Sequence, residues 1–522
     1  MEKSFNVAGP CFPDEHYMVP ALDRAPGMRR FVAQRLYFVL HAPRQSGKTT
    51  AIKALAREIN ETGVMTALYF TVESVQRFTN PNEGIPKIVE SMRNAVLRHP
   101  VFGTLVRDPS SPIPALLPPS PGLDVKAFLA LLAERAERPL AVFFDEVDCL
   151  SDDTLITFLR QLRDGYVTRD ESPFPASIAL VGMRDIRDYK ARIRPESQTL
   201  GTASPFNIIT EDLTFGNFPR DAIAALYAQH TEATGQVFAD GVVDKVWELT
   251  RGQPWLVNAI ARHCVAKIHD YRYGETITVD DVLAAKEAII KARGTHVDSL
   301  MERLKEPRVR RVVEPVILGS ERSVAMNDDD YRFVLDLGIL REDESHRLVP
   351  GNPMYAEIIL RYLSHDLQAQ FYGAYAKPFW LKPDGSLDMA ALMAEFQRFW
   401  RENSGADREV YGYREATPHL VMTGYFQRVV NGGGRIVREM ALGSRRLDLC
   451  IEFGTHRYAV ELKMKSQLRP DSFAQLAGYL DTLGLPEGWM AVFDEDTAKS
   501  WNEKLYLRDE TVDGKTIHVV GL

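Results

Sequence analysis

One ten-residue segment, HAPRQSGKTT at residues 41–50, has the residue types and spacing of a loop that binds the phosphates of a nucleoside triphosphate. It follows an apolar run at 36–40, which predicts a strand, and precedes a helix-forming run at 51–56. The amino end of such a helix offers unpaired N–H groups and a positive dipole end to phosphate. We expect Lys48 to bind the β- and γ-phosphates and the Thr49 hydroxyl to bind Mg²⁺.

The whole loop supplies candidate ATP-binding residues. They are Ala42, Pro43, Arg44, Gln45, Ser46, Gly47, Lys48, Thr49 and Thr50. Ala42 stands where the usual pattern has glycine, and alanine can make the turn there at some steric cost.

A second apolar run, 139–144, ends in the acidic pair Asp145 and Glu146. A continuous apolar run predicts a buried parallel strand, and doubly wound sheets bind ligands at the carboxyl ends of their strands. We expect Asp145 to join the ATP site by holding Mg²⁺ through water, and Glu146 to orient or deprotonate the attacking water. An exposed acidic turn is the alternative.

Two more strands are predicted at 65–72 and 177–183, and a helical region at 220–292. Arg184 follows the second of these strands, where it could sense the γ-phosphate; a surface arginine is the alternative. Gly252 and Pro254 stand inside the helical region.

Together, the phosphate loop, the acidic strand and the Gly-x-Pro turn resemble the AAA-like ATPases of the STAND and archaeal-ATPase groups, over about residues 10–365. The resemblance implies an α/β P-loop ATPase core (1–215), a helical lid (216–295) and a winged-helix domain (296–365). In that family the glycine–proline turn reports the nucleotide state, so Gly252 and Pro254 become possible sensors. The sequence does not single out an arginine finger, because Arg194 and Arg220 are two of many candidates.

The predicted winged-helix domain is not basic. Residues 301–350 contain nine Lys or Arg against eleven Asp or Glu, and an acidic run at 328–330 stands near the start of the expected recognition helix. A winged helix that reads DNA should be basic there. We therefore favour a structural or regulatory coupling role over DNA binding.

The rest of the chain predicts a linker (366–390) and a second α/β domain (391–522). Its expected elements are a helix at 413–430, strands at 435–442, 446–453 and 457–464, a helix at 473–483 and a last strand at 489–493. Asp448 stands on the second strand, and Glu461 and Lys463 stand on the third. Residues two apart on a strand face the same side, so neighbouring strands can bring the three together.

Carboxylates that converge in this way bind Mg²⁺ or Mn²⁺ through oxygen, and a metal lowers the pKa of bound water. Asp448 and Glu461 are therefore candidate metal ligands, and Lys463 would position or activate the water. The arrangement resembles the PD-(D/E)XK nuclease superfamily. In this chain, Gln475 and Tyr479 match the Gln-x-x-x-Tyr feature of the RecB-like members of that superfamily. The resemblance implies that both line the active edge. It also implies an extra acidic ligand, for which Glu415 and Glu439 compete.

Local charge agrees with a nucleic-acid substrate. Residues 424–447 contain five arginines (Arg428, Arg435, Arg438, Arg445 and Arg446) and one acid, Glu439. Such a patch beside carboxylates fits binding of a phosphate backbone. A hairpin with surface salt bridges, or a nuclease fold that no longer cleaves, are the alternatives.

The composition sets wider bounds. A net charge of −8 excludes a generally basic surface, and no apolar run approaches the length of a membrane span. No apolar core follows the first charged residues, so we expect no secretion signal, and four widely spaced cysteines predict a reducing compartment, the cytoplasm.

The preferred function is an ATP-dependent or ATP-regulated, Mg²⁺- or Mn²⁺-dependent nuclease that acts on DNA, or less readily on RNA. By analogy it would serve phage defence or mobile-element biology, and a homo-oligomer is compatible with it. The alternative is a STAND-type signalling ATPase whose carboxy-terminal domain binds nucleic acid or a protein partner without cutting.

Overall fold

The computed structural model describes residues 3–100, 102–103, 124–150, 152–183, 208–209, 211–292, 294–318, 329–344, 346–363, 380–403, 416–430, 434–442, 445–494, 496 and 499–522. By its internal contacts the chain forms two compact units. The first combines Met1–His296 with Ala325–Arg341, and the second combines Val297–Val324 with Glu342–Leu522. The predicted division into five parts stays a prediction.

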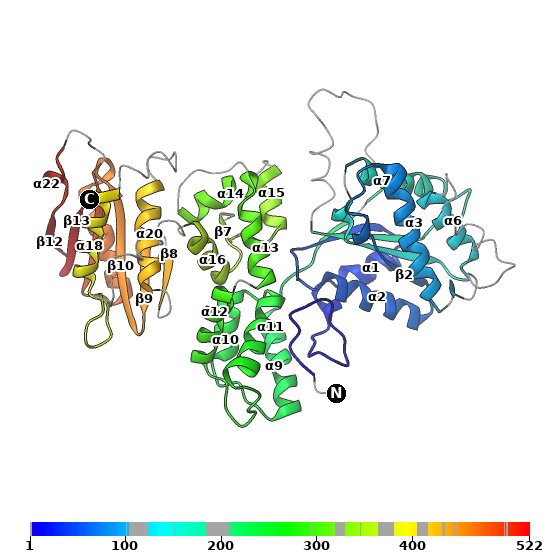
Figure 1. The fold of residues 1–522 in the computed structure, drawn as a ribbon, viewed down its shortest axis with the longest axis horizontal. Coiled ribbons are helices and arrows are strands. Elements are labelled where there is room, and N and C mark those ends of the chain that lie inside the picture. Colours follow the sequence, from blue (N-terminus) through cyan, green and yellow to red (C-terminus); the bar gives the residue numbers. More distant parts are fainter. Residues whose placement is uncertain are drawn as a thin grey trace. The chain divides into compact units, whose positions relative to one another are not determined.

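The first unit contains a parallel sheet of five described strands, in the order β2-β3-β4-β1-β5 (Figure 1). The strands are β1 (Tyr37–His41), β2 (Thr66–Thr71), β3 (Leu140–Asp145), β4 (Ser177–Gly182) and β5 (Glu211–Thr214). All of their pairings are parallel. The expected parallel α/β architecture is therefore confirmed, with β5 as an additional short edge strand.

Helices cover both faces of this sheet. The covering helices are α1 (Gly27–Ala33), α2 (Lys48–Thr62), α3 (Pro81–Arg98), α6 (Val125–Arg135) and α7 (Asp152–Val167), with short 3₁₀ turns η1 (Ala21–Arg24), η2 (Glu73–Val75) and η3 (Val147–Cys149). Successive strand residues enter opposite cores: Phe143 packs with α1 and α2, whereas Phe144 packs with α3, α6 and α7. Burial on both faces explains why the central strands read as continuous apolar runs.

A helical part follows the sheet, as the sequence predicts. It consists of α9 (Arg220–Thr234), α10 (Val242–Thr250), α11 (Pro254–His263), a π-helical turn η4 (Cys264–Ile268) and α12 (Val279–Ala292). The amino-terminal segment packs on this part, because the Phe5 ring lies 5.6 Å from the Tyr227 ring and 5.4 Å from the His230 ring, centroid to centroid.

Four helices and a two-stranded sheet come next. In chain order they are α13 (Thr295–Leu304), α14 (Pro307–Leu318), α15 (Asp329–Asp336), β6 (Leu340–Glu342), β7 (Leu348–Pro350) and α16 (Pro353–Leu363). The predicted winged-helix domain (296–365) stays a prediction. No helix in the described ranges is long and apolar enough to cross a membrane.

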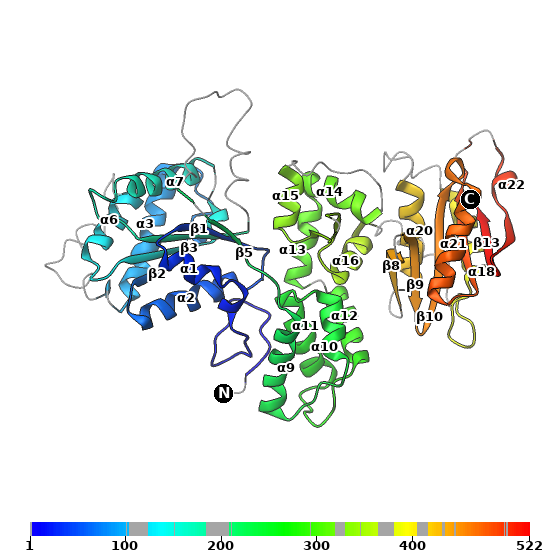
Figure 2. The ribbon, with the colours of Figure 1, turned by 180° about the vertical axis from the view of Figure 1, so that it is seen from behind.

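The carboxy-terminal sheet has six described strands in the order β12-β13-β11-β10-β9-β8. They are β8 (Gly434–Leu442), β9 (Arg445–Phe453), β10 (His456–Met464), β11 (Glu487–Phe493), β12 (Leu507–Val512) and β13 (Lys515–Gly521). The accompanying helices are α18 (Met389–Asn403), α20 (Ala416–Val430), α21 (Pro470–Leu483) and α22 (Trp501–Lys504), with the 3₁₀ turn η6 (Lys465–Gln467). Figure 2 shows α21 against the sheet, where its apolar residues join the core.

Two expectations for this domain are wrong. The strand at 489–493 is not the last one, because β12 and β13 follow it as an antiparallel pair. Their turn is Asp513-Gly514, both with positive φ, and Asp-Gly between two strand-like runs is a strong hairpin signal. The helix at 413–430 is not the first one, because α18 precedes it. The buried residues of α18 have the spacing of an amphipathic helix, which is a signal for this helix in the sequence. They are Met389, Leu392, Met393 and Phe396.

Candidate functional site

The phosphate loop lies between the end of β1 and the start of α2. Gln45 (φ 57°) and Gly47 (φ 94°) both adopt the left-handed backbone conformation, so the chain turns sharply into the helix. Lys48 is buried, and its Nζ donates to the carbonyl oxygens of Ala42 (2.7 Å) and Pro43 (3.0 Å). Burial lowers the pKa of Lys48, and the carboxylates Asp148, Glu146 and Asp145 counteract that effect. The ammonium is thus held over the loop.

Alanine is tolerated at the first position of the motif. Ala42 is buried, its N–H donates to the carbonyl of Gly182 on β4 at 3.2 Å, and its φ is not positive. The turn at this position therefore does not require glycine.

Asp145, at the end of β3, is the centre of the acidic part of the site. It is 1% exposed. Its Oδ2 accepts hydrogen bonds from the hydroxyls of Thr49 and Tyr69, both at 2.8 Å, and its Oδ1 accepts one from the N–H of Glu146 at 3.0 Å. The two predicted Mg²⁺ ligands, Thr49 and Asp145, are therefore in direct contact. Sequence reasoning missed Tyr69, since nothing local to β2 marks its side chain as functional.

Glu146 occupies a strained backbone position beside Asp145. Its φ and ψ are 60° and 38°, which is uncommon outside glycine and often marks functional sites. Burial raises the pKa of Glu146, and the Asp145 charge raises it further. A carboxylate with a raised pKa is better suited to accept a proton from water.

The Gly-x-Pro turn has backbone reasons for both of its residues. Gly252 has a φ of 73°, and a Cβ placed there would lie 1.8 Å from the carbonyl oxygen of Phe218. Its own carbonyl accepts from the Phe218 N–H at 2.8 Å. Pro254 begins α11, where its missing N–H costs nothing. The other predicted sensor, Arg184, and the finger candidate Arg194 lie outside the described residues.

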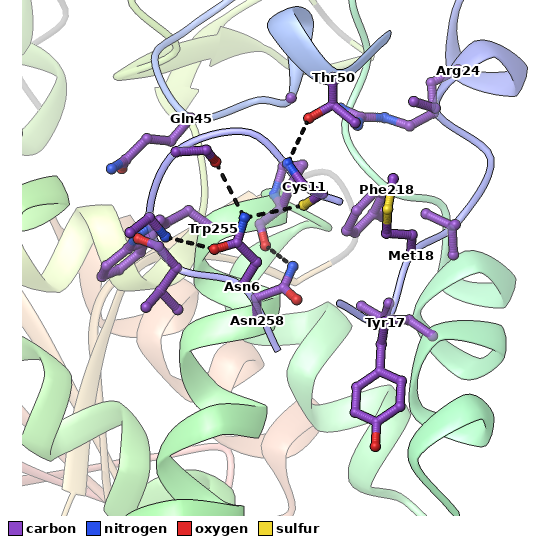
Figure 3. Close-up of a pocket in the computed structure, with 18 residues that line it drawn as sticks. Asn6, Cys11, Tyr17, Met18, Arg24, Gln45, Thr50, Phe218, Trp255 and Asn258 are labelled. Atoms are coloured by element: carbon purple, nitrogen blue, oxygen red, sulfur yellow. Dashed lines mark hydrogen bonds between the residues drawn. The ribbon is translucent and has the colours of Figure 1, made fainter. Parts of the chain in front are cut away.

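A pocket with about 650 Å³ of empty space, open solvent at its mouth included, adjoins the loop (Figure 3). It lies between the amino-terminal segment, the phosphate loop and the helical part. Its lining residues are Asn6, Val7, Ala8, Gly9, Cys11, Tyr17, Met18, Val19, Ala21, Arg24, Gln45, Gly47, Thr50, Phe218, Leu226, Pro254, Trp255 and Asn258. The Trp255 indole N–H donates to the Val7 carbonyl at 2.8 Å and so ties the segment to α11.

The polar groups at this pocket include one buried acceptor without a hydrogen-bond partner. Asn258 Nδ2 donates to the Pro254 carbonyl at 2.8 Å, which fixes the orientation of the amide because a carbonyl can only accept. Its Oδ1 is left unpaired, as is the buried hydroxyl of Ser46. Sequence reasoning missed the amino-terminal segment and Asn258, because neither carries a recognisable motif and both reach the loop only through the fold.

A second cluster joins β9 and β10 in the carboxy-terminal domain. Lys463 Nζ donates to Glu461 Oε1 at 2.8 Å. The Leu462 N–H donates to Asp448 Oδ2 at 2.8 Å, and the Asp448 N–H donates to Glu461 Oε2 at 3.4 Å. The structure thus brings together the three residues that the sequence predicts.

The electrostatics of this cluster favour a cation. Burial, followed by the charge of Asp448, raises the pKa of Glu461 to about 7. Burial lowers the pKa of Lys463, but Glu461 and Asp448 outweigh that effect and raise it. No group of three or more His, Cys, Asp or Glu within the described ranges is placed to hold a metal. Two carboxylates still fit Mg²⁺, which usually keeps several water ligands.

The accessory residues are only partly described. On α21, Gln475 Nε2 donates to the Tyr479 hydroxyl at 2.5 Å, and Tyr479 contributes to the raised pKa of Lys463. Glu415 lies outside the described residues. The side chains of Glu439 and of the five arginines between 424 and 447 also lie outside the described part of the structure.

No protein-family model matches the chain, and no curated protein matches it. Among solved structures, the Walker-type ATPase PABY2304 of Pyrococcus abyssi is similar at 12% identity and a TM-score of 0.48, over 68% of this chain and 99% of that one. The Thermotoga maritima Holliday junction branch migration motor RuvB has 13% identity and a TM-score of 0.33, over 63% of this chain and 91% of that one. Cdc6p of Pyrobaculum aerophilum has 14% identity and a TM-score of 0.35, over 67% and 95%.

The close approach of Gly252 to Phe218 predicts that Gly252→Ala destabilises the first unit. The new methyl group would overlap a backbone oxygen, and the positive φ adds strain of about 1 kcal/mol or more. Gly235→Ala is the matched control, because Gly235 also has a positive φ (80°) but nothing lies within 4 Å of its would-be Cβ. Urea unfolding should show a clearly larger decrease in the free energy of unfolding for Gly252→Ala than for Gly235→Ala. Equal decreases would mean that the contact with Phe218 does not contribute to stability.

Proposed function

We propose that the chain is an ATPase switch that regulates a metal-dependent nuclease in its own carboxy-terminal domain, with DNA as the substrate. The observation that carries the first half is the contact of Thr49 with Asp145 beside Glu146, at the carboxyl end of β3. The observation that carries the second half is the cluster of Asp448, Glu461 and Lys463.

In the ATPase, each residue has a role that its position supports. Lys48 would exchange the two carbonyl oxygens that it now contacts for phosphate oxygens. Thr49 and Asp145 would hold Mg²⁺, which neutralises charge on the phosphates. Glu146 would accept the proton of the attacking water. The adjoining pocket, which contains Trp255 and Asn258, offers room for the base and sugar.

Regulation is supported by further contacts that the loop makes within the first unit. Three residues of the loop, His41, Pro43 and Gln45, each contact a residue that is remote in the sequence. His41 Nδ1 lies 3.5 Å from Asp336 Oδ1, and Pro43 packs against Gly338. Gln45 Oε1 is hydrogen-bonded to His296 Nδ1. His296 ends the first stretch of the first unit, and Asp336 and Gly338 belong to its second stretch. Both stretches continue directly into the second unit, so a shift of the loop on binding ATP would reach these connections.

This arrangement fits a coupling role for residues 296–365, the predicted winged-helix domain. Asp336, an acidic residue of this domain, contributes to the loop contact. The possible sensors Gly252 and Pro254 would add a second route, through α11.

In the nuclease, Asp448 and Glu461 would hold Mg²⁺ or Mn²⁺, which stabilises the developing charge of the phosphate and lowers the pKa of the attacking water. Lys463 would orient that water or offset the charge, and Gln475 and Tyr479 would border the site. The arginines of residues 424–447 would hold the DNA backbone, with RNA as the lesser alternative. Such a pairing of switch and nuclease in the cytoplasm would suit phage defence or mobile-DNA biology.

A second candidate function is a signalling ATPase whose carboxy-terminal domain binds nucleic acid or a protein partner without cutting. The observation that favours it is the ion pair of Lys463 with Glu461 at 2.8 Å, because the lysine already offsets part of the charge that a metal would neutralise.

The ATP site predicts that replacing Lys48 removes ATP binding, whereas replacing Glu146 removes ATP hydrolysis. Lys48→Ala should abolish binding of a fluorescent ATP analogue, because the only ammonium group in the loop is removed. Glu146→Gln should bind ATP with nearly parental affinity and yet lose turnover by roughly two orders of magnitude or more, since only proton acceptance changes. Phosphate release measures the turnover. Parental binding by the Lys48 variant would contradict the assignment.

The second cluster predicts that cleavage depends on each of its three residues in its own way. Asp448→Ala and Glu461→Gln should reduce Mg²⁺-dependent cleavage by orders of magnitude, since each change removes a metal ligand. Lys463→Ala should keep DNA binding and lose rate. Asp481→Asn, a change at an exposed carboxylate on α21 (84% exposed side chain), is the control and should leave cleavage unchanged. Parental cleavage by the Asp448 variant, purified free of other nucleases, would place the centre elsewhere.

A further inference from the structure

Arg24 is a half-buried cation at the phosphate loop, and none of the roles proposed for the ATP site involves it. It is the last residue of η1, and η1 packs against α2, the helix that follows the loop. Its side chain reaches the pocket from the side opposite Trp255, near Thr50 and Phe218 (Figure 3). Burial lowers the pKa of Arg24 to about 9, which still leaves the guanidinium charged at neutral pH.

The guanidinium joins two backbone segments that are far apart in the sequence. Its Nη2 donates to the Ser46 carbonyl in the phosphate loop at 2.6 Å. Its Nε donates to the Gly216 carbonyl at 2.9 Å, in the segment between β5 and α9. The charged group also lies 4.0 Å from the ring centroid of Phe215 and 4.8 Å from that of Phe218. Hydrogen bonds from a charged donor and cation–π contacts both hold it in place.

The bond to Ser46 sets the direction of one phosphate-binding group. In a planar trans peptide the C=O and the following N–H point in opposite directions. When Arg24 holds the Ser46 carbonyl on its own side, the Gly47 N–H points away from Arg24. Gly47 leaves room for this approach, because a Cβ there would lie 3.2 Å from Arg24 Nη1.

The bond to Gly216 reaches the helical part. Two residues after Gly216, the Phe218 N–H donates to the Gly252 carbonyl at 2.8 Å, and Gly252 accepts this close approach only because it lacks a side chain. Gly252 is followed by Gln253 and by α11. One guanidinium therefore links the peptide that orients Gly47 to the turn that positions α11.

We propose that Arg24 is a positioning residue that couples occupancy of the phosphate loop to the position of the helical lid. The proposal rests on the proposed ATP binding and adds a mechanism to it. When phosphate draws the loop closer, the Ser46 carbonyl moves with it, and Arg24 transmits the movement through Gly216 and Phe218 to the Gly252–Pro254 turn.

The test compares amide hydrogen exchange at residues 250–263 in the full-length protein, with and without saturating ATP·Mg²⁺, together with the affinity for ATP. In the parent, ATP should slow exchange in this segment. Arg24→Gln should weaken ATP binding by about tenfold or more, the size expected for loss of a charged hydrogen bond. Even at saturating ATP, its lid segment should exchange as fast as without nucleotide.

Two further variants make the test specific. Arg29→Gln is the matched control. Arg29 also contacts α2, where its Nε lies 2.7 Å from Glu58 Oε1, but it contacts neither the loop nor the lid in this structure. The lid of the Arg29→Gln variant should therefore respond to ATP like that of the parent. Arg24→Lys keeps the charge beside the two rings but cannot bond both carbonyls in the same way. In Arg24→Lys, ATP should also fail to slow amide exchange at residues 250–263. This variant provides the test if Arg24→Gln does not fold.

The outcomes separate this inference from the proposed function. If the parent does not bind ATP, the proposed function fails. If the parent binds ATP and its lid responds, a parental lid response in Arg24→Gln or in Arg24→Lys at saturating ATP would overturn the role of Arg24 alone. Loss of the response in both variants, with a parental response in Arg29→Gln, would support it.

Discussion

The first unit depends on a buried carboxylate, Asp145, which must be compensated where water cannot reach it. An ionised carboxylate is stable in such a place only when hydrogen bonds or a cation offset its charge. Asp145 receives hydrogen bonds from α2 (Thr49), from β2 (Tyr69) and from its own turn (Glu146). Two separate elements and the turn after β3 are thereby fixed around one point, next to a loop that ends in Lys48. The same negative charge that constrains the fold also makes the point a suitable place for Mg²⁺.

The carboxy-terminal domain also contains carboxylates whose charge must be offset, Asp448 and Glu461. Asp448 and Glu461 approach each other across two antiparallel strands, and Lys463 and backbone N–H groups offset only part of their charge. The result is the raised pKa of Glu461. In both sites two acidic residues come from strands and their ends, where a sheet fixes backbone positions more firmly than a loop does, and a lysine lies close to them. Each arrangement gathers carboxylates whose charge a bound cation would offset further, which is the physical basis for proposing metal chemistry at both.

The sequence predicts well those features that depend on local pattern. Continuous apolar runs predict the central strands, because burial on both sheet faces requires apolar residues at every position, as at Phe143 and Phe144. The motif at 41–50 and the spacing of Asp448, Glu461 and Lys463 predict contacts that the structure contains. β5 was not predicted, since its short sequence, EDLT, is mostly polar. Tyr69, Arg24 and Asn258 were not predicted either, because their positions follow from the packing of segments remote in sequence. β12, β13 and α18 did carry local signals and could have been found.

The central claim is that ATP at the first site controls chemistry at the second. The most direct measurement follows nicking of supercoiled plasmid by the full-length protein in Mg²⁺ or Mn²⁺, without nucleotide, with ATP and with a non-hydrolysable ATP analogue. We expect metal-dependent nicking whose rate changes when ATP is added. Nicking at the same rate under all three nucleotide conditions would contradict control by ATP, and no nicking with either metal under any of them would contradict the nuclease itself.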